Sequence, residues 1–370
     1  MKMVFRWFGH GNDSVKLQHI KQIPGVEGIV WALHDIPVGE EWPLERILDM
    51  KQQADRYGFH MDVVESVNVH EDIKLGLPTR DLYIENYKRT IENLAKVGVK
   101  VICYNFMPVF DWIRTDLFKE MEDGSTAMFY EKAKVENLNP NELVDEIANN
   151  PDFTIPGWEP ERLKSLSHLF EAYRRVSTQQ LWANLRYFLE QIIPVAELHD
   201  VKMAIHPDDP PWPIFGLPRL ITSQDNIRRL LQLVESPSNC VTLCSGSLGA
   251  NGENDIAGMV REFADRIPFA HIRNLKRYEN GDFIETSHRT KDGSVEIFDI
   301  VKAYHDTSFT GYVRPDHGRH IWDEQCRPGY GLYDRALGVM YLWGIWDSLE
   351  SVKKVQQETV APQSLSNART

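Results

Sequence analysis

Four short segments of the chain place metal-binding side chains directly after apolar runs. They are Ile205-His206-Pro207, Leu243-Cys244-Ser245, Ala270-His271-Ile272 and Pro315-Asp316-His317. Imidazole nitrogen, thiolate sulfur and carboxylate oxygen together suit a borderline divalent ion such as Zn²⁺, Fe²⁺ or Mn²⁺, and they argue against Ca²⁺, which prefers oxygen. We therefore interpret His206, Cys244, His271 and Asp316 as candidate ligands of one metal ion, with positions left open for a substrate.

The placement of the histidines supports this hypothesis only as a group. Five of the thirteen lie at or just past the end of a short apolar run, namely His10, His34, His206, His271 and His317. A single histidine there is more often a packed or surface residue, and a lone Cys244 is more often a small buried hydrophobic residue. Asp316 could equally be a loop carboxylate paired with a neighbouring arginine. The metal hypothesis therefore depends on a fold that brings the four segments together.

The fold predicted from the pattern is α/β, a closed (β/α)₈ TIM barrel. Short apolar runs alternate with longer segments of helical periodicity, which indicates a parallel sheet. Eight such units favour a barrel over a doubly wound sheet, where five or six strands are usual. The predicted strands are residues 4–9, 28–33, 60–66, 99–107, 201–207, 241–247, 269–274 and 311–317. Barrel enzymes carry their sites at the carboxyl ends of the strands, where the candidate ligands stand.

We expect residues 1–350 to form a single barrel domain. Residues 108–164, after the fourth predicted strand, form a long insertion that we predict to be a helical cap over the barrel mouth; a decorative or dimerising insertion explains it equally well. Residues 282–294 are predicted to form a small hairpin that turns at Asp292-Gly293. The polar residues 351–370 are expected to be a disordered tail.

Composition excludes several classes of partner. The chain of 370 residues has 41 Lys and Arg against 54 Asp and Glu, a net charge of −13. Phosphates would be repelled over the whole surface, so no nucleic acid and no anionic membrane is expected as a partner. Four cysteines without a CxxC pair make no disulfide framework, and no signal peptide or membrane span is recognisable. We expect a reduced, cytoplasmic protein that acts on a small molecule.

Glycine motifs give no support for a nucleotide cofactor. Gly246, Gly249 and Gly252 form a GxxGxxG run, which differs from the dinucleotide fingerprint GxGxxG, and neither GxxxxGK[ST] nor GxSxG occurs. We interpret these glycines as positions of close backbone approach to the site, or as a flexible loop.

Longer motifs around the same residues resemble the mannonate dehydratase family of hexuronate (glucuronate) degradation. The matching segments are HPDDPPWPIFGLPR at 206–219, MPVFDWIRTDL at 107–117, LCSGSLG at 243–249, HIRN at 271–274, RPDHGRH at 314–320 and GYGLYDRALG at 329–338. The resemblance covers essentially the whole chain. It implies a xylose-isomerase-like TIM barrel, and a hydro-lyase that converts D-mannonate into 2-keto-3-deoxy-D-gluconate with Mn²⁺ or Fe²⁺.

The resemblance also implies residue roles. The implied metal ligands are His206, Cys244, His271 and Asp316. These are the same four residues that we interpreted above as candidate ligands because of their positions at the ends of predicted strands. His317 and a tyrosine of GYGLYDR carry over as the acid and base, and we prefer Tyr330 to Tyr333. The reaction removes the C2 proton and expels the C3 hydroxyl, and the metal must neutralise the charge that develops. Candidate binders of the substrate carboxylate or hydroxyls are Arg273, Asn274, His288 and Arg314.

Other hypotheses compete with this one. A related metal barrel could be a sugar isomerase or epimerase, and a barrel DNA-repair endonuclease would use a trinuclear histidine-rich site, which the net charge disfavours. A non-catalytic sugar-binding barrel is the third class. We expect a homodimer, since the aromatic segment Tyr341-Leu342-Trp343-Gly344-Ile345-Trp346 near the carboxyl terminus could be a dimer face as well as barrel packing.

Overall fold

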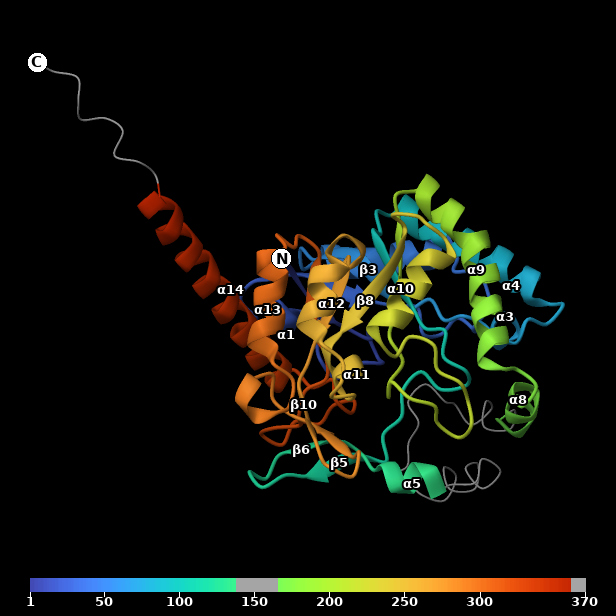
Figure 1. Cartoon of the computed structure of the whole chain (residues 1–370). Helices are drawn as coiled ribbons and strands as arrows, with labels where there is room; N and C mark the ends of the chain where they lie inside the picture. The colour runs from blue at the N-terminus through green and yellow to red at the C-terminus, as the bar shows by residue number, and fades with distance from the viewer. Residues whose placement is uncertain (138–165, 361–370) are drawn as a thin grey trace, which may run out of the picture.

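The computed structural model describes residues 1–137 and 166–360, which form a closed barrel of eight parallel strands (Figure 1). In chain order the strands are β1 (Lys2–Arg6), β2 (Val26–Trp31), β3 (His60–Glu65), β4 (Val101–Tyr104), β7 (Lys202–Ile205), β8 (Asn239–Cys244), β9 (Phe269–Ile272) and β12 (Tyr312–Pro315). Pairing of β12 with β1 closes the ring. The predicted TIM barrel is confirmed, and each of the eight predicted runs overlaps one of these strands.

Each strand ends before its predicted run does, because ladder pairing stops at the rim while the chain continues outward. His206 and Asp316 therefore lie one residue beyond β7 and β12. Such positions leave side chains free to face the mouth of the barrel, where barrel enzymes hold their sites.

Two apolar layers hold the barrel together. Small residues from the strands fill its interior, among them Val4, Val30, Val63, Val101 and Ala204. The outward-facing residues of the same strands pack against the surrounding helices in a larger cluster. The principal helices are α2 (Leu44–Asp55), α4 (Arg80–Lys96), α8 (Leu166–Tyr173), α9 (Thr178–Leu198), α10 (Gln224–Leu233), α12 (Ile256–Glu262), α13 (Ile297–Asp306) and α14 (Tyr333–Val360), with shorter α1 (Leu17–Ile20), α3 (Glu71–Leu75) and α11 (Ser245–Gly249). Along each strand, residues that face the barrel interior alternate with residues that face the helices.

The carboxyl-terminal helix corrects one expectation. The disordered tail was predicted to begin at residue 351, but α14 continues to Val360 and extends away from the barrel (Figure 1). Its earlier residues Leu342, Ile345 and Trp346 are buried, so this part packs on the barrel. A continuous helix can carry its polar end into solvent because its backbone hydrogen bonds are internal. Residues 361–370 lie outside the described residues.

The insertion after β4 begins as β-structure rather than the predicted helical cap. Strands β5 (Asp116–Glu120) and β6 (Thr126–Tyr130) form a hairpin whose turn holds Gly124 at φ 79°, and the short helix α5 (Lys132–Asn137) follows. The sequence Asp123-Gly124 suits such a turn because glycine adopts a positive φ without steric cost. The rest of the predicted cap, from residue 138 onward, lies outside the described residues.

A third correction concerns the hairpin predicted to turn at Asp292-Gly293. Strands β10 (Leu275–Arg277) and β11 (Phe283–Glu285) pair instead around Asn280-Gly281, where Gly281 has φ 89°. Gly293 is extended at φ −135°, so it cannot make a tight hairpin turn. Because β11 also pairs with β6, the order β10-β11-β6-β5 forms an antiparallel accessory sheet, seen along the lower side of the molecule in Figure 1.

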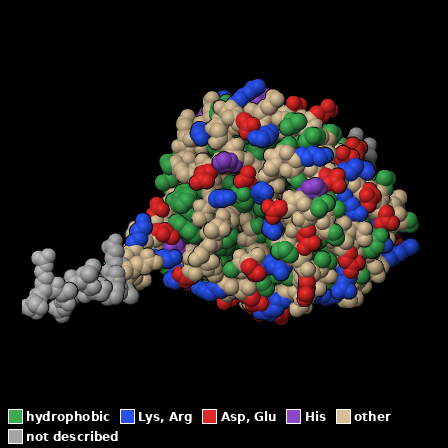
Figure 2. All heavy atoms as spheres, turned by 90° about the horizontal axis from the view of Figure 1, so that it is seen from above, with side chains coloured by type: hydrophobic (Ala, Val, Ile, Leu, Met, Phe, Trp, Pro, Cys, Tyr) green, Lys and Arg blue, Asp and Glu red, His purple; other side chains and the backbone are tan. Residues whose placement is uncertain are grey.

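The surface carries charges of both signs. Figure 2 shows acidic and basic side chains interspersed over one face of the molecule. Within residues 1–137 and 166–360, no helix has the length and apolarity needed to cross a membrane.

Candidate metal centre and active site

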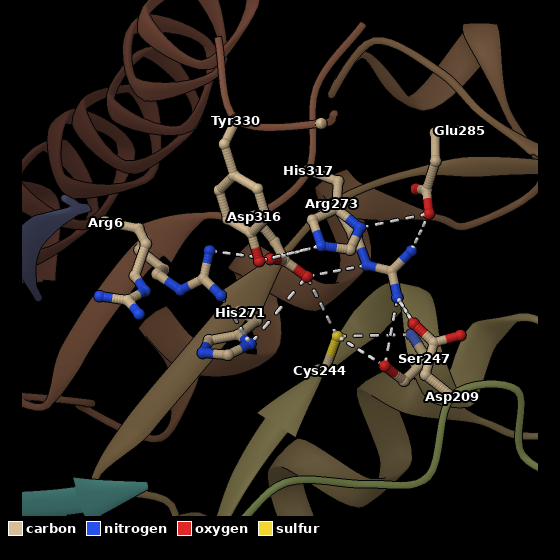
Figure 3. Close-up of polar contacts among 12 residues, drawn as sticks. Arg6, Asp209, Cys244, Ser247, His271, Arg273, Glu285, Asp316, His317 and Tyr330 are labelled. Carbon is tan, nitrogen blue, oxygen red and sulfur yellow. Dashed lines mark hydrogen bonds and ion pairs between the residues drawn. The ribbon is translucent and has the colours of Figure 1, made fainter. Parts of the chain in front are cut away.

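The four predicted ligands meet at the carboxyl-terminal mouth of the barrel, although they come from four different strands. The Nε2 atom of His206 lies 3.2 Å from Nδ1 of His271, and the Cys244 sulfur completes a group whose ligand atoms all lie within 4.8 Å of one another. Asp316 Oδ2 is 3.5 Å from the Cys244 sulfur and 4.0 Å from His271 Nδ1. Such a cluster has the dimensions of a single-ion site, and Figure 3 shows three of its members, Cys244, His271 and Asp316.

The orientation of the two histidines fits a cation between them. His206 Nδ1 donates to the carbonyl oxygen of Pro207 at 2.7 Å, and His271 Nε2 lies 3.2 Å from a carboxylate oxygen of Glu65. Held in this way, the rings direct their remaining nitrogens, His206 Nε2 and His271 Nδ1, at each other. Two nitrogen lone pairs 3.2 Å apart require a proton or a metal ion between them.

Cys244 is poised as a thiolate. Its sulfur accepts hydrogen bonds from the backbone N–H of Ser247 at 3.4 Å and from the Ser247 hydroxyl at 3.1 Å. Burial opposes ionisation, but the Arg273 guanidinium and hydrogen bonds from both histidines hold the pKa of the thiol well below its ordinary value. Burial likewise lowers the pKa of His206, but the hydrogen bond and the charge of Cys244 outweigh it and raise that pKa to about 9. The thiolate is the form that binds metals.

A buried network of charges surrounds this cluster. Arg314 contacts Glu65 Oε1 at 2.9 Å and Asp316 Oδ1 at 2.8 Å. Arg273 contacts Asp316 at 2.8 Å, Asp209 at 2.6 Å and Glu285. The same two carboxylates, Asp209 and Glu285, bind the fully buried Arg114 at 2.9 Å and 2.6 Å.

The balance of this network fits a divalent ion. Three arginines face four carboxylates and the Cys244 thiolate, so the buried anionic groups outnumber the arginines by two; without a metal ion, a proton on His206, whose pKa is raised to about 9, offsets one of these charges. Burial opposes charge on Asp316, yet Arg314, His317 and Arg273 hold its pKa well below the ordinary value. A buried surplus of negative charge is costly unless a cation neutralises it. With the mixed N, S and O donors, this surplus matches one divalent transition metal.

Two of the predicted substrate binders are already paired. Arg273 and Arg314 do line the cavity, but their charges are neutralised by Asp209, Glu285, Asp316 and Glu65. Their contacts hold the Asp316 carboxylate in place. Both side chains nevertheless border the cavity, so their predicted role in binding substrate remains a prediction.

The other two predicted substrate binders lie away from the cavity. The Asn274 amide oxygen accepts the backbone N–H of Leu275 and Val295, and its nitrogen donates to the carbonyl of Arg289. The buried His288 packs against Gly338 of α14. Neither residue borders the cavity that holds the metal cluster. Asn274 instead fixes the loop after β9, because a buried amide needs partners for each of its polar atoms.

The predicted acid and base are brought together. His317 Nε2 lies 3.1 Å from the hydroxyl of Tyr330, and both residues line the cavity beside the metal cluster. Burial raises the pKa of Tyr330 to about 12 although the Arg314 charge opposes this shift. Tyr333, the alternative, is 42% exposed and packs on Trp322, so the structure favours Tyr330. Gly329 has φ 77°, and a side chain there would overlap Met128, so glycine is required beside Tyr330.

His34, one of the five histidines selected at the ends of apolar runs, lines the cavity. Other residues that line it were not selected from the sequence, namely Arg6, Glu65, Asn68, Asn105, Asp111, Trp112 and Arg327. Glu65 ends β3 and Arg6 ends β1, so the strand-end rule that selected the ligands could have found both. His10, grouped with the rim histidines, is exposed and does not border the cavity. Of the glycine run, Gly246 behaves as interpreted, because a side chain there would collide with Arg273.

The fold and the site define a class: a TIM-barrel protein whose mouth holds a candidate transition-metal centre beside a histidine–tyrosine pair. The family model described as D-mannonate dehydratase (UxuA) matches residues 1–356. The chain is 72% identical over 359 residues to mannonate dehydratase 1 of Halalkalibacterium halodurans, covering 97% of this chain and 99% of that protein. The chain therefore belongs to the D-mannonate dehydratase family.

Solved structures agree with this assignment. The crystal structure of mannonate dehydratase from Streptococcus suis serotype 2 superposes with a TM-score of 0.85 at 44% identity, covering 94% of each chain. A xylose isomerase domain protein from Planctomyces limnophilus has a TM-score of 0.54 at 12% identity and covers 95% of this chain and 99% of that one. The second likeness shows the fold alone, and it confirms the xylose-isomerase-like barrel.

Proposed function

We propose that this protein is a hydro-lyase that converts D-mannonate into 2-keto-3-deoxy-D-gluconate and water, in hexuronate catabolism in the cytoplasm. The observation that carries the proposal is the cluster of His206, Cys244, His271 and Asp316 beside the His317–Tyr330 pair. Membership of the D-mannonate dehydratase family supports the substrate. The proposed metal is Mn²⁺ or Fe²⁺, both compatible with mixed nitrogen, sulfur and oxygen ligands.

The chemistry determines what the site must supply. A proton leaves C2, next to a carboxylate, and hydroxide leaves C3, after which the enol tautomerises to the 2-keto acid. A divalent ion held by the four ligands supplies the Lewis acidity that stabilises negative charge developing on substrate oxygen. The protein must also provide a group that accepts the C2 proton and another that protonates the departing hydroxide.

The two groups are assigned by their chemistry. A phenol is protonated at neutral pH, and burial strengthens this tendency in Tyr330. We therefore assign Tyr330 as the donor to the departing C3 hydroxyl and His317 as the acceptor of the C2 proton. Their 3.1 Å hydrogen bond offers a route to return the proton from the imidazole to the phenol after each turnover.

Arg6 and Arg327 provide the free positive charge for an anionic substrate. Both line the cavity, and neither makes an ion pair with any residue in the described part of the chain. Arg6 hydrogen bonds to backbone carbonyls and to His34, and the exposed Arg327 lies over the Phe8 ring at 4.4 Å. We propose that these residues attract the substrate carboxylate, in place of Arg273 and Arg314.

Arg327→Gln is expected to raise KM for mannonate roughly ten- to a hundredfold with a smaller effect on kcat, because a charge-assisted hydrogen bond contributes about 1.5–3 kcal/mol. Steady-state kinetics measures both constants. Arg289→Gln is the matched control, since Arg289 is exposed, pairs with Asp292 and lies outside the cavity. An unchanged KM in Arg327→Gln would remove this residue from substrate binding.

The proposed function is tested by incubating the metal-reconstituted protein with D-mannonate and assaying 2-keto-3-deoxy acid by its colour reaction. Metal-dependent formation of this product is expected, and Asp316→Ala is expected to abolish it. Recovery of an isomer or epimer of the substrate without dehydration would assign the protein to the isomerase class. Binding of mannonate without any metal-dependent turnover would indicate a sugar-acid-binding barrel.

We propose a homodimer as the assembly. The support is an exposed apolar stripe on α14, formed by Tyr333, Leu337 and Met340 at helical spacing, with Trp322 beside it. Light scattering coupled to size-exclusion chromatography is expected to give twice the mass of one chain. Leu337→Glu is expected to shift that mass to the monomer value.

A further inference from the structure

The accessory sheet reaches the proposed acid–base pair through one carboxylate. Glu285 is the last residue of β11 and is fully buried. Its Oε1 atom lies 3.4 Å from His317 Nδ1, while His317 Nε2 lies 3.1 Å from the Tyr330 hydroxyl. The imidazole is therefore held between Glu285 on one side and Tyr330 on the other (Figure 3).

This arrangement has a direct consequence for the proton on the ring. A neutral imidazole has one N–H, and a carboxylate can only accept a hydrogen bond. The proton of His317 then resides on Nδ1, which leaves the lone pair on Nε2 facing Tyr330 and the cavity. An imidazole with the opposite tautomer could not accept a substrate proton through Nε2.

Glu285 is itself fixed as a carboxylate. The same Oε1 atom accepts from Arg114 at 2.6 Å and from Arg273, and both arginines also bind Asp209. Burial raises the pKa of Glu285, but the two guanidinium groups outweigh it and hold this pKa below its ordinary value. The side chain is thus an ionised acceptor with little freedom to rotate.

The accessory sheet also holds the loop that joins His317 to Tyr330. Thr126 of β6 exchanges two backbone hydrogen bonds with His320, of 3.1 Å and 2.7 Å. The His320 ring in turn accepts the backbone N–H of Gly329 at 2.9 Å, directly before Tyr330. Two strands of one sheet therefore support both members of the pair.

We propose that Glu285 is the positioning residue of His317: its carboxylate keeps the proton on Nδ1 and directs Nε2 toward the substrate, so that the accessory sheet is part of the active site. The inference rests on the function proposed for His317. It adds to that function a residue 32 positions away in the chain and on a different sheet.

The location of the proton tests this proposal without any assay of activity. Long-range ¹⁵N–¹H spectra of histidine-labelled, full-length protein, loaded with diamagnetic Zn²⁺ and recorded at about pH 8.5, distinguish Nδ1–H from Nε2–H. His317→Asn identifies the signals. We expect the proton on Nδ1 in the wild type; a wild-type spectrum with the proton on Nε2 overturns the proposal, whether or not mannonate is the substrate.

Variants then show whether Glu285 is responsible for the location of the proton on His317 Nδ1. Glu285→Ala is expected to lose the preference for Nδ1–H and to lower kcat roughly a hundredfold or more with little change in KM, as when a histidine loses its orienting carboxylate. Glu285→Gln retains an acceptor oxygen and is expected to recover part of both. Asp209→Ala is the matched control, because it removes a carboxylate from the same two arginines without touching His317.

The control separates positioning from a general loss of structure. Asp209→Ala is expected to keep the Nδ1–H signal even where its stability and rate fall. An unchanged Nδ1–H signal in Glu285→Ala would overturn the proposal, as would an equal loss of that signal in Asp209→Ala. If Glu285→Ala does not fold, the wild-type and Glu285→Gln spectra still test the proposal. A wild-type spectrum with the His317 proton on Nε2 is sufficient to reject the proposal.

Discussion

Cys244→Ala is expected to lose its metal ion and at least about 10³-fold in kcat for mannonate dehydration. The thiolate is one of four donors, and a bound metal contributes several kcal/mol to the stability of a developing negative charge, with each 1.36 kcal/mol worth a factor of ten in rate. Inductively coupled plasma mass spectrometry after reconstitution and gel filtration measures the metal content. His206→Ala is expected to behave in the same way.

Cys240→Ala provides the matched control for this prediction. Cys240 lies on the same strand, β8, and is also buried, but it lies four residues before Cys244 inside the barrel. We expect its replacement to lower the free energy of unfolding by roughly 1 kcal/mol while metal content and kcat remain near wild type. Full metal content and full activity in Cys244→Ala would contradict the proposed metal centre.

Tyr330→Phe is expected to lower kcat roughly 10²- to 10⁴-fold at nearly constant metal content. The change removes only the hydroxyl, which the structure places 3.1 Å from His317, and general acid–base groups contribute factors of this size. Burial raises the pKa of Tyr330 to about 12, so its phenol remains a proton donor across the neutral range. Steady-state kinetics with mannonate, together with metal analysis, measures the two effects.

Tyr333→Phe separates a specific role for Tyr330 from a general effect on this segment. Tyr333 belongs to the same motif but is partly exposed and contacts Trp322. We expect its kcat to equal that of the wild type within a factor of two or so. A large loss in Tyr333→Phe with full activity in Tyr330→Phe would reverse the proposed assignment of Tyr330 as the proton donor.

The acidic character of the protein does not conflict with an anionic substrate. The chain has a net charge of −13, and on the face shown in Figure 2 acidic and basic side chains are interspersed. Inside the cavity, in contrast, Arg6 and Arg327 carry positive charge that no described carboxylate neutralises by an ion pair. Attraction of a small carboxylate depends on such local charge, because exposed charges beyond about 8–10 Å are screened by salt.

The chain's periodicity determined the barrel and the candidate ligands. Runs such as 201–207 and 241–247 alternate with helical segments, and parallel strands expose their carboxyl ends on one rim. A residue that follows a strand must therefore lie at that rim, which is why His206 and Asp316 could be selected without a structure. The local turn was less well determined: Asn280-Gly281 carried the hairpin signal, while Asp292-Gly293 did not form a hairpin turn.

Only the tertiary structure decided which charges are free and which are paired. Arg114 meets Asp209 and Glu285 across sequence separations of 95 and 171 residues, and no local pattern encodes such contacts. For this reason Arg273 and Arg314 were indistinguishable in the sequence from unpaired cavity arginines such as Arg327. The position of Glu285 beside His317 arises in the same way, because pairing between strands β11 and β6 of the accessory sheet is a long-range contact. Sequence periodicity sets the direction in which a strand presents its residues, whereas the partner of each buried charge is fixed only when distant segments pack together.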